Sequence, residues 1–319
     1  MCSRVARSTS QPAILRPSAI APNTVLTPAS RAPVTTLKTS RMRSEGFWPT
    51  NPVQVGLIHE IIRQGRRGLR LQGWNNGIDM DMLIGAGCVA SVETSYIGIS
   101  AFGLALNFRR ASERGALTVI EHSETTGLDM FRATVMGMSF FPTKTPLGSD
   151  LMRSNEHLAE IACPFTGEPF AAVRAAQPDV AIIHAHTADK YGNVQLDLQR
   201  WNDQSADVLI GKAARTTLVS VEQIVSDEEL YRNSPLTVLP RKFVTAVVEA
   251  PYGAHPCACD ARYDYDLEAV EKYYQASKSE GSFKAYLDAT VRDVADHMGY
   301  LERIGLERLM HLTRTRVVR

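Results

Sequence analysis

The residues best suited to chemistry follow strand-like runs, where open α/β sheets bind their ligands. The first such loop consists of Gly73, Trp74, Asn75, Asn76 and Gly77. Its small residues and two amides offer donors close to a ligand, and a helix predicted to begin at Asp79 adds its dipole. Asp79 and Asp81 in the first helical turn argue against a bound phosphate. The alternative is a tight left-handed turn, which an Asn-Gly pair forms by itself.

A second group of reactive side chains ends another strand-like run and precedes a helix. It consists of Glu121, His122, Ser123, Glu124, Thr125, Thr126 and Gly127. A glutamate carboxylate can act as a nucleophile toward an activated acyl group, and an imidazole or hydroxyl can hold the oxyanion or orient that carboxylate. The alternative is a polar N-cap, with Ser123 or Thr125 capping the helix and the acidic residues favoured by its dipole.

Two patterns resemble metal ligands. His184 and His186, with Asp189 in the following loop, would share one face of a strand, but the sequence offers no obvious third ligand. Cys257 and Cys259 form a single C-x-C pair without a second pair. Local hydrogen bonding explains the histidines better, so we predict no metal site.

A stiff turn rich in proline and glycine, residues 250–256, follows the last apolar strand-like run. It contains His255, for which a functional role and a loop fixed by packing are equally good explanations.

These candidates need an alternating α/β frame to position them. Apolar runs predict strands at 68–72, 89–97, 117–122, 139–143, 170–175, 180–185, 217–224 and 243–250. Helical periodicity and capping residues predict helices at 51–65, 79–84, 104–114, 128–138, from Ser226, at 266–277 and at 283–312. In the first part of the chain this βαβα order predicts a parallel sheet covered by helices.

Composition limits the classes of function. The 319 residues are 44% hydrophobic and 22% charged, with 35 basic and 34 acidic residues and a net charge of +1. This balance favours neither nucleic acid nor a membrane surface as a partner. No apolar run approaches the ~20 residues that span a bilayer. The five cysteines, an odd number, favour a reducing compartment such as the cytoplasm over a disulfide framework.

Residues 1–44 differ from everything that follows. They contain no Asp or Glu and are rich in Ser, Thr, Arg and Pro. Such a segment buries too little apolar surface to offset its chain entropy, so we predict a disordered or non-native extension at 1–44 and a single domain at 45–319. The same composition is typical of an organellar transit peptide, which would place the protein in the mitochondrial matrix.

Several stretches in one order resemble a known family. They are Gly46 and Phe47, then residues 60–65, 81–85, 179–185, 226–229, 250–256 and 263–266. Together they are similar to the alpha subunit of family I CoA-transferases of the glutaconate type, from about residue 46 to about residue 312. The resemblance implies a Rossmann-like α/β/α sandwich with a mostly parallel sheet.

The resemblance also implies a ping-pong reaction shared with a homologous beta subunit, in a heterodimer or an α2β2 assembly. A glutamate that belongs to the beta partner attacks an acyl-CoA and passes through an anhydride to a glutamyl-CoA thioester. A second carboxylate then takes the CoA. The alpha subunit lines the carboxylate pocket. A coenzyme A thioester and a small carboxylate are therefore the implied substrates, and no permanently bound cofactor is implied.

Residue by residue, the resemblance carries over only in part. Gly46 and Phe47 match the end of the family's glycine-rich first strand, and Gly73 to Asn76 match the loop that meets the substrate. Gly73 stands where glutaconate-type chains have serine, and Trp74 suggests a bulkier or more apolar acyl group. The family's first apolar strand has no counterpart in the polar residues 35–45, which predicts a damaged or partly open sheet edge.

Two other functions remain open. Related hydrolases that open steroid-derived rings on CoA thioesters use an acid of the alpha subunit near Glu121, so Glu121, with Glu124 beside it, is the candidate for a hydrolytic reaction. This fold also serves in ligand-sensing regulators, but those need a DNA-binding helix pair at one end. Residues 1–44 show no helical period and do not supply it.

Overall fold

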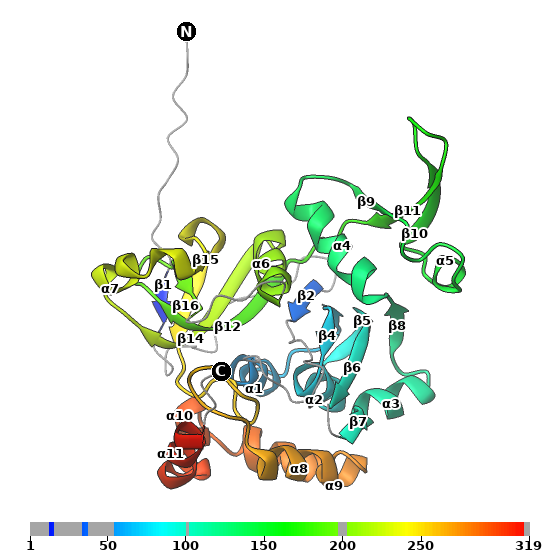
Figure 1. Cartoon of the computed structure of the whole chain (residues 1–319). Helices are drawn as coiled ribbons and strands as arrows, with labels where there is room; N and C mark the ends of the chain where they lie inside the picture. Colours follow the sequence, from blue (N-terminus) through cyan, green and yellow to red (C-terminus); the bar gives the residue numbers. More distant parts are fainter. Residues whose placement is uncertain (1–12, 16–33, 38–53, 100–101, 197–202, 316–319) are drawn as a thin grey trace.

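The computed structural model describes residues 13–15, 34–37, 54–99, 102–196 and 203–315. Within that part of the chain the main sheet has ten strands, eight of them in one path (Figure 1). The order along the path is β1 (Ala13–Leu15), β16 (Ala246–Glu249), β14 (Thr216–Ile224), β12 (Val180–Ala188), β2 (Val34–Leu37), β3 (Leu69–Gln72), β5 (Val89–Thr94) and β8 (Thr118–Glu121). Every neighbouring pair on this path is parallel. The predicted α/β class with a mostly parallel sheet is therefore confirmed.

The central strand β12 shows why the sheet is covered on both faces. All nine of its residues are buried, as expected of a parallel strand between two layers. Val180 and Ile182 belong to one core cluster, while Ala181 packs in another cluster with residues of helices α4 (Glu124–Val135) and α6 (Asp203–Ala213). Because successive side chains of a strand point to opposite faces, helices lie on both sides of this strand.

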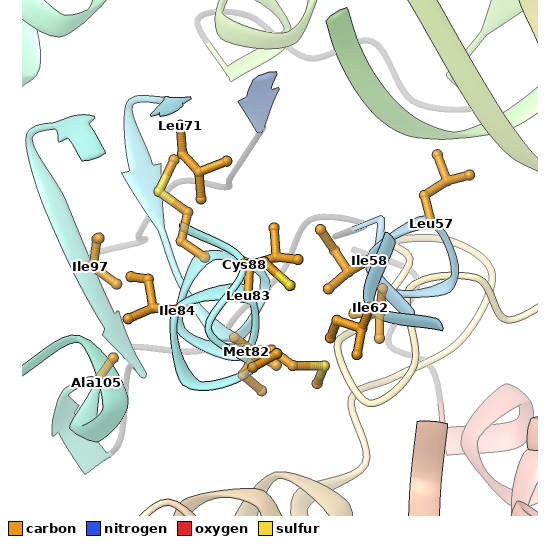
Figure 2. Close-up of a cluster of buried hydrophobic side chains, with 14 of the residues drawn as sticks. Leu57, Ile58, Ile62, Leu71, Met82, Leu83, Ile84, Cys88, Ile97 and Ala105 are labelled. Carbon is orange, nitrogen blue, oxygen red and sulfur yellow. The ribbon is translucent and has the colours of Figure 1, made fainter. Parts of the chain in front are cut away.

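The larger core cluster lies between the sheet and two helices. Figure 2 shows Ile58 and Ile62 of α1 (Val55–Arg63) pointing toward the side chains of α2 (Ile78–Gly85). Helix α1 follows the predicted helical spacing of apolar residues, and Gly65 beyond its end has φ of +63°. Glycine reaches this left-handed conformation without strain, so it ends the helix as the sequence predicts.

Two short strands come from the segment predicted to be disordered or non-native. Strand β2 lies between β12 and β3, and β1 pairs with β16 at the other end of the path. The expected loss of the first strand is therefore wrong for residues 34–37. The rest of residues 1–44 lies outside the described residues, and the domain boundary at 44 stays a prediction.

A second sheet corrects the expected topology. Strand β9 (Phe140–Thr143) does not extend the parallel sheet but pairs antiparallel with β11 (Pro169–Arg174), which pairs with β10 (Leu158–Ala162). Helix α5 (Leu151–Ser154) precedes β10. In Figure 1 the hairpin of β10 and β11 projects from the body of the protein. Alternating apolar residues predict a strand but not its partner, and here the partner is a local hairpin.

Small additions surround the main sheet. Strand β13 (Val194–Gln195) pairs antiparallel with β12 and with β15 (Thr237–Leu239). The strand predicted at 89–97 is divided at Ser95 into β5 and β6 (Tyr96–Ile99). Strand β6 pairs with β4 (Asn75–Asn76) and β7 (Gly103–Leu104).

Helix α3 (Leu106–Glu113), predicted at 104–114, leads from β7 toward β8. Short turns of 3-10 helix, 234–236 and 241–243, flank β15, and the second shortens the strand predicted at 243–250.

The C-terminal part is more broken than expected. Helices α7 (Asp227–Arg232), capped by Ser226, and α8 (Leu267–Ala276) follow the predictions. The helix predicted at 283–312 is instead α9 (Glu280–Leu287), a π-helical turn (Asp288–Arg292), α10 (His297–Ile304) and α11 (Leu306–Thr315). Asp296 caps α10, and Gly305, with φ of +88°, separates α10 from α11.

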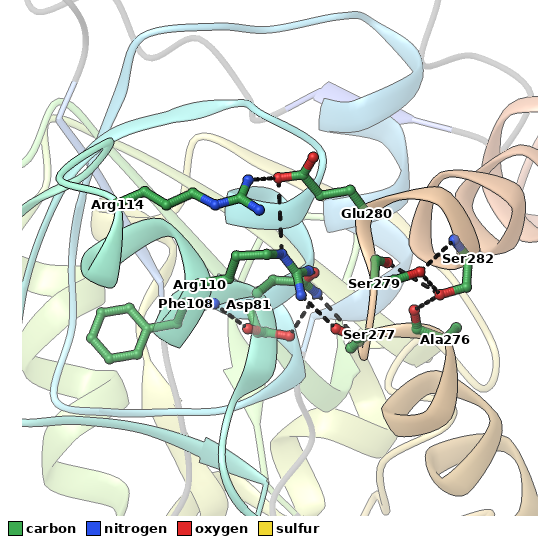
Figure 3. A network of polar contacts seen from close by, with 10 residues as sticks. Asp81, Phe108, Arg110, Arg114, Ala276, Ser277, Ser279, Glu280 and Ser282 are labelled. Atoms are coloured by element: carbon green, nitrogen blue, oxygen red, sulfur yellow. Dashed lines mark hydrogen bonds and ion pairs between the residues drawn. The ribbon is translucent and has the colours of Figure 1, made fainter.

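A buried carboxylate joins this C-terminal part to the core. Asp81 of α2 accepts hydrogen bonds from Tyr273 Oη at 2.6 Å, Phe108 N at 2.7 Å and Asn107 Nδ2 at 2.9 Å. Figure 3 shows Asp81 in this network, with Arg110 and Arg114 reaching Glu280 at the start of α9. Burial raises the pKa of Asp81, against the effect of its hydrogen bonds.

Among the described residues, no helix is long and apolar enough to cross a membrane. Within the described ranges, Cys88, Cys163, Cys257 and Cys259 form no disulfide.

Candidate active site

The two predicted site loops lie at the same edge of the main sheet. Strands β3, β5 and β8 are parallel neighbours, with Gln72 opposite Glu93 and Thr94 opposite Glu121. Gly73 N donates to Glu93 O at 3.0 Å, and His122 N donates to Thr94 O at 3.0 Å. The carboxyl end of β5 therefore joins the loop after β3 to the loop after β8.

Two hydroxyl side chains hold the loop after β3: Thr94, at the end of β5, and Ser95, which follows it. Thr94 Oγ1 donates toward Trp74 O at 2.7 Å and Asn76 Oδ1 at 2.9 Å. Ser95 Oγ lies 2.6 Å from Trp74 O and 3.1 Å from Asn75 Oδ1. Trp74, Asn75 and Asn76 are buried. No residue from Gly73 to Gly77 has a positive φ, so the alternative of a left-handed Asn-Gly turn is wrong.

Gly73 leaves room for the side chains of its neighbours. A Cβ at this position would lie 2.4 Å from Asn76 Oδ1 and 2.7 Å from Met80 Cε. The Asn76 amide thus fills the space that a larger residue would occupy. This contact gives a physical reason for glycine where the resembling chains have serine.

Asp79 supports the loop from the first turn of α2. Its carboxylate accepts from Gly77 N at 2.8 Å and lies 3.4 Å from Asn76 Nδ2. Burial raises the pKa of Asp79 to about 6, although these hydrogen bonds lower it. The residue is fully buried and holds the loop, in addition to lying at the positive end of the helix.

The loop after β8 begins helix α4. Ser123 is its N-cap and accepts from Thr126 N at 3.2 Å, so the capping interpretation is confirmed for Ser123. His122 is buried, whereas Glu121 and Glu124 are exposed. Asn75 Nδ2 donates to Glu124 Oε1 at 2.8 Å and joins the two loops directly. Two exposed carboxylates, an amide and a hydroxyl therefore border one edge, a set suited to acyl chemistry.

Four side chains that the sequence analysis missed lie beneath these loops. Glu93 Oε1 lies 3.0 Å from His122 Nε2 and 2.6 Å from His157 Nδ1, and Glu93 Oε2 accepts from Gln72 Nε2 at 2.7 Å. Asn155 Nδ2 donates to Glu121 O at 2.7 Å. The sequence could have indicated Glu93, because it is a carboxylate inside an apolar strand and a buried charge needs partners. His157 and Asn155 lie in a polar loop that carries no such signal.

The network sets the ionisation of Glu93. Burial alone would raise its pKa, but the hydrogen bonds from His122, His157 and Gln72 outweigh burial and hold that pKa well below its usual range. The hydrogen bond with Glu93 raises the pKa of His157, against the effect of burial. The pair is therefore a carboxylate with a readily protonated imidazole.

Some predicted residues lie elsewhere. Gly46 and Phe47 are outside the described residues, and their role stays a prediction. His184 lies 2.8 Å from Ser220 Oγ and 2.6 Å from Glu222 Oε1, with Cys259 nearby. Asp189 holds the following turn by accepting from Tyr191 N and Asn193 N at 2.9 Å each. The pattern of two histidines and an aspartate therefore does not form one ligand set.

The turn at residues 250–256 is a packed structural loop. A Cβ on Gly253 would lie 2.7 Å from the His184 ring, so glycine is needed there. His255 is buried between Tyr300 Oη at 2.7 Å and Asp266 Oδ2 at 3.1 Å. Packing explains this histidine, and nothing in the fold brings it to the loops after β3 and β8.

A sequence profile of the coenzyme A transferase family matches residues 49–250. The chain is 36% identical over 270 residues to an uncharacterized protein of Archaeoglobus fulgidus, covering 83% of this chain but only 59% of that protein. It is 35% identical over 284 residues to the A subunit of glutaconate CoA-transferase of Acidaminococcus fermentans, covering 84% of this chain and 88% of the relative. It is 34% identical over 264 residues to the A subunit of 3-oxoadipate CoA-transferase of Pseudomonas knackmussii, covering 82% and 91%.

The fold comparison agrees. The crystal structure of glutaconate coenzyme A-transferase from Acidaminococcus fermentans matches with a TM-score of 0.82 and 32% identity, over 94% of this chain and 95% of the other. A more distant relative, the IpdA subunit of a cholesterol ring-cleaving hydrolase of Rhodococcus jostii, is 28% identical over 251 residues, covering 76% and 83%.

Proposed function

Because the chain belongs to the coenzyme A transferase family, we propose that it is the alpha subunit of a heteromeric acyl-CoA:carboxylate CoA-transferase. The observation that carries the proposal is the hydrogen bond from Asn75 to Glu124, which joins the two loops predicted to meet the substrate. Identity of 35% and 34% to chains named as A subunits supports a beta-type partner.

In the proposed reaction the nucleophile is a glutamate of the beta subunit. Its carboxylate attacks the thioester carbonyl carbon, the C–S bond breaks and CoA thiolate leaves an acyl-glutamyl anhydride. The thiolate then attacks the glutamyl carbonyl and expels the first carboxylic acid, which leaves glutamyl-CoA. A second carboxylate takes the CoA by the same two steps in reverse. No permanently bound cofactor is needed for this sequence.

The role of this chain is to line the carboxylate pocket. Trp74, Asn75 and Ser123 border the edge that carries Glu124, and Thr94 and Ser95 fix the backbone of Trp74. Rigid donors are the useful contribution here, because an ordered pocket holds the carboxylate in line with the partner's nucleophile. Gly46 and Phe47 are proposed to lie beside this pocket.

The first experiment combines the purified chain with a beta-type partner. Glutaconyl-CoA or 3-oxoadipyl-CoA is supplied with and without acetate, while acetyl-CoA and free thiol are followed. Acetyl-CoA formed only with both the partner and acetate is the expected result. Acetyl-CoA formed by the chain alone would contradict the two-subunit proposal.

The second candidate is an acyl-CoA-dependent hydrolase that uses Glu121. The relative named as a cholesterol ring-cleaving hydrolase subunit favours it, as does the exposed carboxylate of Glu121 at the end of β8. Consumption of the acyl-CoA with the partner but without acetate, abolished in Glu121→Gln, would replace the transferase proposal. Asn155 fixes the carbonyl of Glu121, so the glutamine variant keeps the backbone geometry.

Trp74 gives a direct test of the pocket. The side chain is 5% exposed, and its Nε1 has no hydrogen-bond partner among the described residues. We propose that this N–H binds an oxygen of the acyl group. Trp74→Phe keeps most of the ring and removes the donor. We expect KM for the acyl-CoA to rise by up to about tenfold, since a hydrogen bond contributes about 0.5–1.5 kcal/mol.

The stability of the variant is the control for this test. An unpaired buried donor destabilises the free protein, so Trp74→Phe should unfold at an equal or higher urea concentration. An unchanged KM in a folded variant would show that the indole N–H takes no part in binding.

A further inference from the structure

Glu93, His122 and His157 bring three ligand atoms to one point. These are Glu93 Oε1, His122 Nε2 and His157 Nδ1, which all lie within 4.8 Å of one another. The residues come from the end of β5, the end of β8 and the loop before β10. We propose that these three side chains bind one Zn²⁺ ion. Two imidazoles and one carboxylate, with a position left for water, are a recurrent zinc ligand set.

One of the two separations from Glu93 fits this ion, and the other is shorter than a zinc site requires. Ligands bonded to Zn²⁺ at about 2.0–2.2 Å and 90–110° apart lie about 2.9–3.5 Å from each other. The separation of Glu93 Oε1 from His122 Nε2 is 3.0 Å, inside that range. The separation from His157 Nδ1 is 2.6 Å, so this imidazole needs to move by a few tenths of an ångström.

Each ligand is held by a further partner, as metal ligands usually are. Gln72 Nε2 donates to the other carboxylate oxygen of Glu93 at 2.7 Å. Thr126 Oγ1 lies 3.1 Å from His122 Nδ1, which leaves Nε2 to face the ion. Thr126 is itself fixed by the backbone N–H of Ser123 at 3.0 Å. Two of the three ligands are thus already oriented.

The Asn155 amide does not compete for this position. Asn155 Nδ2 donates to Glu121 O at 2.7 Å, so its 3.3 Å contact with His122 Nε2 needs no hydrogen bond. The ring nitrogen that faces Glu93 at 3.0 Å can therefore give its lone pair to an ion.

Accessibility distinguishes this group from the other possible set in the described residues, His184, Glu222 and Cys259. The His157 side chain is 19% exposed, so the group is open to solvent at this residue. In the other set, none of the three side chains is as exposed as His157.

Metal content and spectrum test the proposal without any assay of activity, so its outcome is independent of the proposed function. The full-length chain is treated with a chelator, desalted, incubated with ZnCl₂ and desalted again. We expect one zinc per chain by mass spectrometry of the metal. Co²⁺ added to the stripped chain should give visible absorption bands typical of a site with four or five ligands. Less than a tenth of an equivalent of retained zinc would overturn the proposal.

Variants locate the ion. His157→Gln removes a half-buried ligand with the smallest risk to folding, and Glu93→Gln removes the carboxylate. Each should weaken zinc binding at least about a hundredfold, since loss of outer partners alone weakens it 10–100-fold. Cys259→Ser is the matched control and should retain one equivalent. Zinc retained fully by folded His157→Gln, or lost in Cys259→Ser, would overturn the assignment. Circular dichroism identifies an unfolded Glu93→Gln, in which case His157→Gln decides.

Discussion

At the scale of single residues, one glycine explains the shape of the loop after β3. Gly73 leaves the space that the Asn76 amide fills, and Asn76 in turn accepts from Thr94 and faces Asp79. The departure from the serine of resembling chains is therefore linked to a second residue. A change at either position alone disturbs the loop that carries Trp74 and Asn75.

Gly73→Ala tests this link. The added Cβ would lie 2.4 Å from Asn76 Oδ1, so the amide must move and lose its bond from Thr94. We expect the free energy of unfolding to fall by about 1–3 kcal/mol, the usual effect of overpacking. Urea denaturation followed by tryptophan fluorescence measures the change.

Gly127→Ala is the matched control. Gly127 lies inside α4, and a Cβ there would make only ordinary contacts, the nearest with Trp74 Cδ1 at 3.5 Å. Alanine favours a helix interior by about 0.5–1 kcal/mol, so this variant should be slightly more stable. Equal effects of the two substitutions would argue against a specific contact at Gly73.

At the scale of elements, helix α2 is unusual because its acidic residues are buried. Seven of its eight residues, from Ile78 to Ile84, are buried, including Asp79 and Asp81. The two carboxylates serve different parts of the fold, since Asp79 holds the loop after β3 and Asp81 ties α3 and α8 to the core. The helix is therefore a junction between the candidate active site and the C-terminal part of the chain.

Asp79 predicts a measurable dependence of stability on pH. Its pKa is about 6 in the folded chain, against about 3.9 in an unfolded chain. The folded state binds the proton more tightly, so the contribution of Asp79 is fully present below about pH 4 and is lost as the pH rises through 6. Relative to Asp79→Asn, the wild type should lose roughly 2 kcal/mol between pH 4 and pH 7.

Urea denaturation of the wild type and of Asp79→Asn between pH 4 and pH 7 measures the difference in their free energies of unfolding. The contributions of the other titrating groups cancel in this difference. Asp288→Asn is the control with the opposite sign. Arg292 and Lys284 lower the pKa of the exposed Asp288, so its stabilising effect is present at neutral pH and is lost in acid. A pH-independent difference between the wild type and Asp79→Asn would contradict the prediction.

At the scale of the whole molecule, buried polar contacts join the C-terminal helices to the rest of the fold in addition to apolar packing. Asp266 caps α8, accepts from Arg308 Nε at 3.0 Å and Nη2 at 2.7 Å, and lies 3.1 Å from His255 Nε2. Burial alone would raise the pKa of Asp266, but the hydrogen bonds from His255 and Arg308 hold it well below its usual range. This carboxylate connects α8, α11 and the turn after β16.

Arg308→Met tests the connection. The variant leaves a buried carboxylate short of its strongest partner, while the methionine keeps much of the apolar stem. The arginine side chain is 30% exposed, so we expect the free energy of unfolding at pH 7 to fall by about 1–3 kcal/mol, less than for a fully buried pair. The loss should shrink in acid, where Asp266 becomes protonated.

Lys284→Met is the comparison. Its ion pair with Asp288 is mostly exposed, with 73% of the lysine side chain accessible, and exposed pairs contribute about 0–1 kcal/mol. If Arg308→Met unfolded at the same urea concentration as Lys284→Met, the link through Asp266 would be of no importance to stability.

Features that depend on neighbouring residues could be predicted from the sequence. The periodicity of Leu57, Ile58 and Ile62 predicted α1, the continuous apolar run predicted β12, and Ser226 predicted the start of α7. Helix α4 was predicted at 128–138 but begins four residues earlier, at Glu124. The loops at Gly73 and Glu121 were also predictable, because both follow strands of a parallel sheet. These features follow from local sterics and burial, which a short stretch of sequence contains.

The contacts between those elements could be seen only in the folded chain. The tertiary structure brought Glu93 to His157, 64 residues away, and placed β9 in an antiparallel sheet. It set β2 inside the main sheet and divided the last predicted helix at Asp296 and Gly305. Contacts across such separations depend on strand order and register, and these result from packing the whole chain at once. No local pattern of residues specifies them.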